Sequence, residues 1–357
     1  MQLRHQLTSV AAALVVLALV DMPQPLLAQA GKNAKDTKGA ATLVWPLPPE
    51  KPRLKYLAQY HGAIDFKKKP GRWKSALLGN APDTVPADMF VKPYAVAVGP
   101  DGRVYVTDTA ARRVFVVDRE HGAISFIGDR GNVSLTKPVG IAIDERGFVY
   151  VSDATLKRVF AFSQAGNVAL AIGRDGEFDS PAGLAIDRIR HVLYVVDSSR
   201  HQIVCYSSVD GTRIRTIGTR GSELGEFNFP TNLAVSRDGL VYVADTLNFR
   251  IQVFDPDGKP VRAFGTLGDA PGTFNRPKGV AVDSEGHVYV ADSAFDNFQV
   301  FDAQGQLLLF VGHGGGDAGQ FVLPAGIYVD ERDQVYVADQ GNARVQVFQY
   351  LRTEATK

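Results

Sequence analysis

The chain has 357 residues, of which 45% are hydrophobic and 22% are charged, and its formal net charge is +1. This composition is typical of a globular protein and excludes a largely disordered or membrane-embedded chain. Because basic and acidic residues nearly balance, the overall charge predicts neither nucleic acid nor an anionic membrane as a partner. Any binding argument must therefore be local.

The N-terminus has the pattern of an export signal. An apolar run from Leu7 to Val20 follows Arg4, and the segment Ala28–Ala30 is an AxA cleavage sequence. The run is shorter than the roughly 20 residues that span a bilayer. We expect residues 1–30 to be a cleaved signal peptide, with a retained anchor as the alternative. The mature chain would then have no transmembrane segment and be periplasmic or secreted, where its single cysteine, Cys205, is predicted to be a core residue.

A sixfold repeat follows a linker, which we expect to be flexible and Pro-rich over residues 31–52. The repeats begin at regularly spaced prolines, 45, 43, 49, 47 and 47 residues apart: Pro93, Pro138, Pro181, Pro230, Pro277 and Pro324. This period is typical of one four-stranded propeller blade and not of helical repeats. In each unit an Asp- and Gly-rich turn joins two apolar strands, and two further strands follow. The sequence therefore predicts an all-β, six-bladed propeller of four-stranded antiparallel blades.

The last blade lacks a strand at its own end of the chain. The sixth repeat stops near Tyr350, whereas residues 53–62, RLKYLAQYHG, have the pattern of an outer strand. Pairing this segment with the last blade would remove an open sheet edge. We expect a propeller over residues 53–350, with an insertion of unassigned role at 63–92, six repeats over 93–350 and a tail at 351–357.

The segment VWPLPPEKPRLKYL, Val44–Leu57, resembles the entry region of exported bacterial NHL propellers, and three elements of the repeat resemble the NHL-repeat family. They are the PxG opening, the VYVAD strand and a DxxNxRIQVF element, best seen in Asp245–Phe254 and approximated by Asp339–Phe348. The resemblance implies the propeller fold. It also implies a range of functions, because members bind RNA, proteins or other ligands and one branch includes peptidylglycine amidating lyases. A shared fold by itself assigns no activity.

An aspartate ends the second strand of every repeat: Asp108, Asp153, Asp197, Asp245, Asp292 and Asp339. A ring of carboxylates around a metal is one interpretation. Aspartate at a strand end also bonds its own loop amides, and in four repeats an arginine stands five residues later. We therefore interpret these positions as structural, each paired with its arginine where one is present.

An enzyme is the alternative to a binding protein. A metal-dependent lyase or hydrolase of the amidating-lyase kind would act at the channel mouth, but the innermost strands, such as GVAVD, are mostly apolar and contain no Glu or His. A hard cation requires several converging oxygens, and zinc could only come from His61, His201 and His313. We predict no catalytic residues and no cofactor, and zinc or calcium stays an open alternative.

The loops between second and third strands, together with the blade crossings, carry most of the unpaired basic residues and the departures from the repeat. The candidate binding residues on this face are Arg112, Arg130, Arg174, Arg200, Arg220, Asn232, Phe249, Phe295 and His313. Basic groups interleaved with aromatics bind anionic polymers or extended chains. The leading hypothesis is a monomeric, non-catalytic scaffold that recognises a protein segment or an anionic glycan in the cell envelope, not nucleic acid; a solvated loop face without a partner is the alternative.

Overall fold

The computed structural model describes residues 43–65, 88–129 and 133–352. All of them belong to one compact unit, Thr42–Lys357. The predicted signal peptide, Arg130, most of the linker and most of the insertion lie outside the described residues, as do the last residues of the tail.

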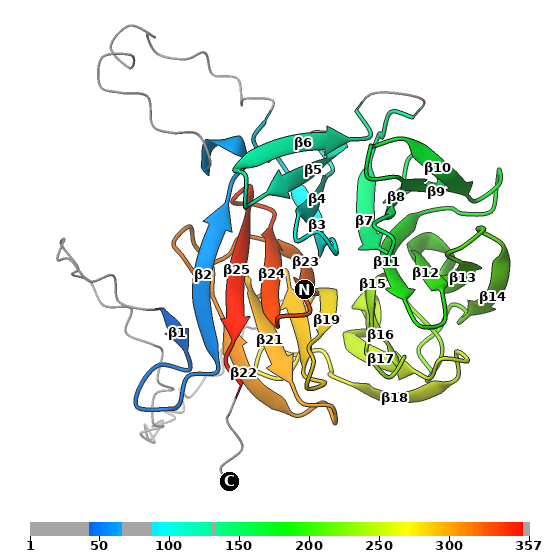
Figure 1. Ribbon diagram of the computed structural model, residues 1–357. Helices are drawn as coiled ribbons and strands as arrows, with labels where there is room; N and C mark the ends of the chain where they lie inside the picture. Colours follow the sequence, from blue (N-terminus) through cyan, green and yellow to red (C-terminus); the bar gives the residue numbers. More distant parts are fainter. Residues whose placement is uncertain (1–42, 66–87, 130–132, 353–357) are drawn as a thin grey trace, which may run out of the picture. The chain divides into compact units, whose positions relative to one another are not determined.

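Six antiparallel sheets surround a central channel (Figure 1). The innermost strands all begin at the repeat proline: β3 (Pro93–Val98), β7 (Pro138–Ile143), β11 (Pro181–Asp187), β15 (Pro230–Val235), β19 (Pro277–Val282) and β23 (Pro324–Val329). The second strands all end at the repeat aspartate: β4 (Val104–Asp108), β8 (Val149–Asp153), β12 (Val192–Asp197), β16 (Val241–Asp245), β20 (Val288–Asp292) and β24 (Gln334–Asp339).

The outer half of each blade has the same regularity. The third strands are β5 (Arg113–Asp118), β9 (Arg158–Phe162), β13 (Gln202–Ser207), β17 (Arg250–Phe254), β21 (Asn297–Phe301) and β25 (Arg344–Tyr350). The outer strands are β6 (Ala123–Ile127), β10 (Val168–Ile172), β14 (Arg213–Ile217), β18 (Pro260–Phe264), β22 (Leu307–Val311) and, for the sixth blade, β2 (Leu54–Tyr60). The predicted all-β, six-bladed architecture is confirmed.

The strand order gives the ring two different faces. We call loop face the side that carries the loops between second and third strands and the crossings between blades, and turn face the opposite side, where the tight turns lie. The three helical turns are short: η1 (Ala63–Asp65), η2 (Ser198–Arg200) and η3 (Thr246–Asn248). None of the helical segments in the described part of the chain has the length and apolarity needed to cross a bilayer.

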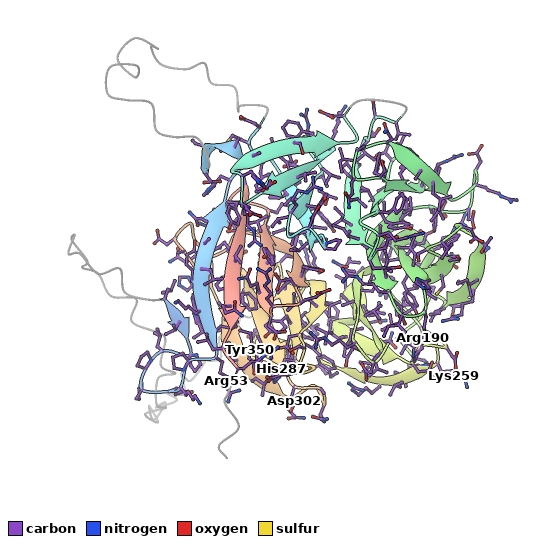
Figure 2. The ribbon with its side chains drawn as sticks, in the orientation of Figure 1. Arg53, Arg190, Lys259, His287, Asp302 and Tyr350 are labelled. Carbon is purple, nitrogen blue, oxygen red and sulfur yellow. The ribbon has the colours of Figure 1, made fainter. Side chains whose placement is uncertain are left out.

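Strand β2 closes the ring, as the sequence predicts. It pairs antiparallel with β25 from Leu54↔Tyr350 to Tyr60↔Val345, and Leu54 is completely buried. The amide of Leu351 donates to the carbonyl of Arg53 at 2.7 Å, and Figure 2 shows Arg53 close to Tyr350. The two ends of the repeat region are thus joined by a continuous sheet.

A further strand lies inside the segment predicted as a linker. Strand β1 (Val44–Trp45) pairs with β2 at Lys55 and Leu54, so the sixth sheet has five strands. The ring of Trp45 meets that of Phe348 edge to face, with centroids 5.5 Å apart. Because this contact packs an aromatic side chain against the sheet, Val44 and Trp45 join the sixth sheet although they lie inside the expected linker.

The core lies between neighbouring blades. Second strands such as β16 are buried along their whole length, because both of their faces pack against another sheet. An aromatic or leucine side chain stands three residues before each repeat proline and is buried, among them Phe227, Phe274 and Phe321. A Cβ at Gly265 would come within 2.3 Å of the Phe274 ring, so this crossing requires a glycine, which also has φ of +92°.

Candidate functional site

The six repeat aspartates are buried and fully used by the fold. In the first blade, Asp108 Oδ2 accepts hydrogen bonds from the amides of Val91 and Lys92 at 2.7 and 2.9 Å. Its Oδ1 accepts from the amides of Ala110 and Ala111. Four backbone donors satisfy a buried carboxylate without a counter-ion. The aspartate therefore fastens the incoming crossing to the second strand.

The predicted aspartate–arginine pair exists in only two blades. Arg250 Nε lies 2.9 Å from Asp245 Oδ2, and Arg344 Nε lies 2.7 Å from Asp339 Oδ2. The prediction is wrong for the first and second blades, where the arginines pair with carboxylates of the following crossing: Arg113 with Asp129 and Arg158 with Asp175. In those blades one oxygen of the repeat aspartate accepts hydrogen bonds from two amides of the crossing, and the other accepts from two amides of the loop, as in Asp153.

In the fourth and sixth blades, where the aspartate pairs with its arginine, the amide of the residue directly before the proline has a different acceptor than in the first two blades. Because one oxygen of Asp245 faces Arg250, the amide of Phe229 bonds His201 Nδ1 of the neighbouring blade at 3.1 Å instead. The amide of Leu323 likewise bonds Asp296 Oδ1 at 2.7 Å. Both residues have positive φ, 48° and 52°. Their side chains are left 40% and 45% exposed on the loop face.

The predicted loop-face residues do not form one cluster. Arg112, Arg174 and Arg220 are exposed and come from different blades and crossings. Arg200 is engaged by Asp179 at 2.9 Å and by the carbonyls of Glu177 and Gly176.

The remaining predicted positions separate as well. His313 is exposed, and its Nδ1 lies 3.1 Å from the Gly314 carbonyl. Phe249 packs against the core between the fourth and fifth blades, and Phe295 is half-buried. Asn232 is not on the loop face but in the wall of the channel. Because Asn232 lies on the innermost strand, its side chain faces the channel, and its sequence-based assignment to the loop face is wrong.

The histidines proposed as zinc ligands are held separately. His201 is buried, accepts from Phe229 and stacks against its ring with centroids 4.5 Å apart. His61 lies beside Asp65 on the turn after β2, and His313 is on another blade. Within the described ranges, no three His, Cys, Asp or Glu side chains are placed to hold a metal ion.

The loop-face end of the channel is closed by two side chains that follow repeat prolines. Tyr94 packs against the cluster containing Val139, Ala182 and Leu233, from the second, third and fourth blades, and so lies across the channel. Lys278 Nζ of the fifth blade lies 5.8 Å from the centre of its ring. This cation–π contact holds the ammonium over the plug.

Positive charge gathers around this plug. Burial is the main reason why the pKa of Lys278 is lowered, and the neighbouring cations Arg276 and Lys92 lower it further. No carboxylate among the described residues offsets them. Arg276 and Lys92 each stand directly before a repeat proline. We call Lys92, Arg276 and Lys278 the cation cluster.

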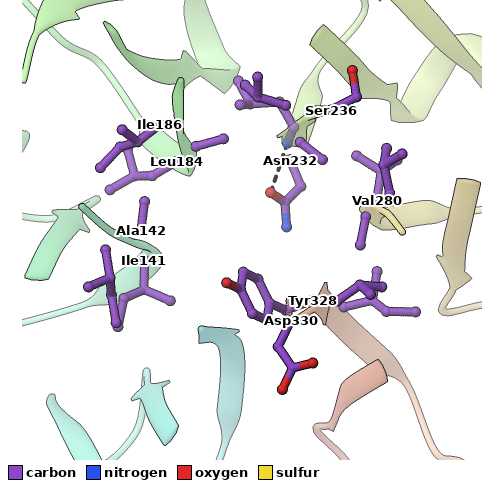
Figure 3. A pocket seen from close by; sticks show the side chains of 18 of the residues that line it. Ile141, Ala142, Leu184, Ile186, Asn232, Ser236, Val280, Tyr328 and Asp330 are labelled. Atoms are coloured by element: carbon purple, nitrogen blue, oxygen red, sulfur yellow. Dashed lines mark hydrogen bonds between the residues drawn. The ribbon is translucent and has the colours of Figure 1, made fainter. Parts of the chain in front are cut away.

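From this plug the channel continues to the turn face as a cavity of about 660 Å³. Aliphatic side chains of the innermost strands line much of this cavity, and Asn232 and Tyr328 are the uncharged polar side chains that these strands contribute between the plug and the turns (Figure 3). Burial raises the pKa of Tyr328, although Arg188 opposes this. The lining includes turn residues such as Arg237 and Ser284, and none of the residues that directly follow the repeat prolines. The cavity therefore opens on the turn face only.

Two family comparisons agree with this geometry. Residues 321–348 match the NHL repeat, and residues 213–314 match the SMP-30/gluconolactonase/LRE-like region. The chain is a six-bladed β-propeller with a segment that matches the NHL repeat. Among curated proteins it is similar to NHL repeat-containing protein 2 of Bos taurus, with 33% identity over 93 residues. That match covers 24% of this chain and only 13% of the bovine protein.

Solved structures share the fold of this propeller at low identity. A gluconolactonase from Xanthomonas campestris has a TM-score of 0.58 at 17% identity, covering 73% of this chain and 87% of its own. A virginiamycin B lyase from Staphylococcus aureus gives 0.54 at 13%, covering 75% and 83%. An auxiliary nutrient binding protein from Bacteroides thetaiotaomicron gives 0.57 at 16%, covering 74% and 70%. Enzymes and a binding protein thus share this architecture, so the fold does not separate the two functions.

Sequence reasoning missed the cation cluster. The signal was present at the position after the repeat proline, where Tyr94 and Lys278 replace the Val, Ala or Thr of the other blades. Pairwise comparison of repeats could have singled out both residues. Their meeting across the channel depends on the closed ring.

Proposed function

We propose that this propeller is a non-catalytic binding protein that holds an acidic, partly apolar polypeptide segment against its loop face. The observation that carries the proposal is the cation cluster. Arg276 and Lys92 are near enough to Lys278 to lower its pKa, and no carboxylate among the described residues raises it. A bound carboxylate would relieve this repulsion and bond to a half-buried ammonium, and such charge-assisted bonds are stronger than neutral ones.

The surroundings favour a polypeptide over a glycan. Phe229, Leu247 and Leu323 are 40%, 45% and 45% exposed on the same face. Exposed apolar side chains beside charges are typical of protein-binding surfaces. Backbone strain supports the same interpretation, because Phe229 and Leu323 occupy the left-handed region, which bulky residues rarely adopt.

The side chains around the plug do not favour catalysis. They supply cations and apolar groups, and the nearest histidine, His201, is buried and engaged with Phe229. Cys205 is buried in the core, and burial raises the pKa of its thiol to about 11, which makes it a poor nucleophile. An unreactive free thiol also agrees with the exported location that we propose from residues 1–30.

The test uses a fluorescein-labelled dodecapeptide that alternates glutamate and leucine, and a matched peptide with lysine in place of glutamate. We expect fluorescence anisotropy to show binding of the acidic peptide only, weakened by roughly tenfold between low and high salt. Lys278→Met keeps the alkyl stem and removes the charge, so the Kd should rise about tenfold or more.

Arg220→Gln is the matched control. It removes an exposed loop-face arginine outside the cation cluster and also tests the original sequence-based assignment. We expect its Kd to stay within about twofold of the parent value. Equal weakening by Arg220→Gln and Lys278→Met would contradict the cation cluster as the binding site, and absence of binding to the acidic peptide would overturn the proposed function. Thermal melts establish that both variants are folded.

A further inference from the structure

The cavity on the turn face is a second site, independent of the loop face. Its volume of about 660 Å³ lies within the range of small-molecule sites. Aliphatic side chains from the innermost strands of five blades line it: Ile141, Leu184, Leu233, Val280 and Ile327 (Figure 3). An apolar ligand would gain free energy by leaving water for such a wall.

Asn232 is one of two uncharged polar side chains that reach the cavity from the innermost strands, and the other is Tyr328. The Oδ1 atom of Asn232 accepts a hydrogen bond from the Leu233 amide at 2.8 Å, which fixes the side chain. Its Nδ2 group faces the cavity in Figure 3, and no described residue accepts a hydrogen bond from it. Other blades have glycine or alanine here, and Gly183 leaves the space that Asn232 occupies, since a Cβ there would lie 2.5 Å from Asn232 Cα. The channel thus presents a fixed donor to a ligand.

An ion pair crosses the mouth of the cavity. Arg188, on the turn of the third blade, places Nη1 2.8 Å from Glu331 Oε1 on the turn of the sixth blade, directly across the ring. Its Nη2 donates to the Ile143 carbonyl of the second blade at 3.3 Å. The side chain of Glu331 is 82% exposed. Exposed pairs contribute little free energy, so this one can open without disturbing the fold.

Two carboxylates at the rim already have partners. Asp187 pairs with Arg190 at 2.8 Å, and Asp283 pairs with His287 at 2.9 Å. Past the rim, a charged ligand group would meet aliphatic side chains and the uncharged polar groups of Asn232 and Tyr328, and burying an unpaired charge is costly. The interior therefore favours an uncharged molecule.

We propose that the cavity binds an uncharged, mainly aliphatic small molecule whose carbonyl oxygen accepts a hydrogen bond from Asn232 Nδ2. The ligand enters from the turn face when the Arg188–Glu331 pair opens. A fatty acid, which would take Arg188 away from Glu331, is the competing ligand class.

The first experiment measures occupancy with the neutral dye N-phenyl-1-naphthylamine, whose fluorescence rises in apolar surroundings. Methyl decanoate should displace the dye at lower concentration than decanoate does. In Asn232→Leu, dye binding should persist, whereas methyl decanoate should bind about three- to tenfold more weakly because one hydrogen bond is lost. Absence of dye binding, or tighter binding of decanoate than of its ester, would overturn the proposal, as would an unchanged ester affinity in Asn232→Leu.

The second experiment tests the entrance by stopped-flow mixing with the same dye. Glu331→Gln should raise the association and dissociation rates together and leave the Kd within about twofold, because an exposed pair stores little free energy. Glu145→Gln is the matched control, since Glu145 occupies the same turn position in the second blade and contacts His191. Equal rate changes in both variants, or none in Glu331→Gln, would contradict the entrance. Lys278→Met should bind the dye normally, so this site can fail or hold independently of the proposed function.

Discussion

The two ends of the central channel differ in chemistry although the same six repeats build both. At the loop face, Tyr94 and Lys278 fill the channel and leave a cluster of cations without carboxylate partners. At the turn face the channel is open, and its acidic groups are mostly paired: Asp187 with Arg190, and Asp283 with His287. The loop-face end is a closed surface that carries positive charge, and the turn-face end opens into a cavity lined by aliphatic side chains.

This difference shows how a repeat fold acquires distinct sites. The regular prolines, aspartates and glycines build the ring, and the chemistry of each end depends on single positions that vary from blade to blade. Because the positions after the prolines converge on the axis, changes at Tyr94 and Lys278 suffice to close one end. Substitutions that open the ring should therefore affect both ends, whereas substitutions at the plug or at the rim should affect one end only.

The largest effect is expected from breaking the closure that both ends share. Leu54→Ala removes a completely buried side chain of β2, and such substitutions cost about 2–5 kcal/mol. Chemical denaturation should show this loss, and both peptide and dye binding should decline together as the ring opens. Leu57→Ala, at a position 40% exposed on the same strand, should cost less than about 1 kcal/mol. Similar losses in the two variants would contradict closure by the buried face of β2.

A smaller effect should follow from opening the closed end. Tyr94→Ala removes the plug and the cation–π contact with Lys278. The dye could then enter from both faces, so its association rate should rise severalfold and become insensitive to Glu331→Gln. Leu156→Ala, on the loop between β8 and β9 and 38% exposed, keeps the plug and should leave the rate unchanged. A Tyr94→Ala variant that still responds fully to Glu331→Gln would show that the plug does not seal the channel.

The smallest effect concerns the rim of the open end. The hydrogen bond to Asp283 raises the pKa of His287 above its ordinary value of 6.5, and the ring also contacts Tyr350 (Figure 2). The protonated form is thus favoured in the folded state, so its contribution is complete below about pH 6.5 and is lost as pH rises through the raised pKa. His287 is half-buried, which limits the contribution to less than about 1 kcal/mol.

Denaturation of the parent and of His287→Gln at about pH 5.5 and pH 8.5 measures this contribution. The stability difference between the two proteins should be larger at the lower pH. His121→Gln, which removes the bond to Asp118 on an exposed turn, is the control and should show a smaller change. A pH-independent difference for His287→Gln would rule out the linkage.

The sequence was sufficient for the fold because the repeat signals are local. The spacing of the prolines gave the blades, and the alternation from Leu54 to Tyr60 gave the closing strand. Strand β1 was missed because Val44 and Trp45 stand in a segment interrupted by prolines, and only the contact with Phe348 shows why they pair.

The sites were less predictable because their residues are distant in the chain. Arg188 and Glu331 are 143 positions apart, and neither departs from an ordinary turn sequence. The sequence also did not show that the repeat aspartates have different partners in different blades. Asp153 and Asp245 look alike in sequence, yet the first binds four backbone amides and the second an arginine.

The pairing of β2 with β25 also sets an order in time. During synthesis the closing strand is among the first parts of the domain to emerge, whereas its partner, Arg344–Tyr350, is the last strand of the ring. Strand β2 therefore cannot pair with β25, and Leu54 cannot be buried against it, until all six blades have been synthesised. Contacts so remote along the chain form slowly, so completion of the sixth blade is the natural final step of folding, and both ends of the channel acquire their shape only then.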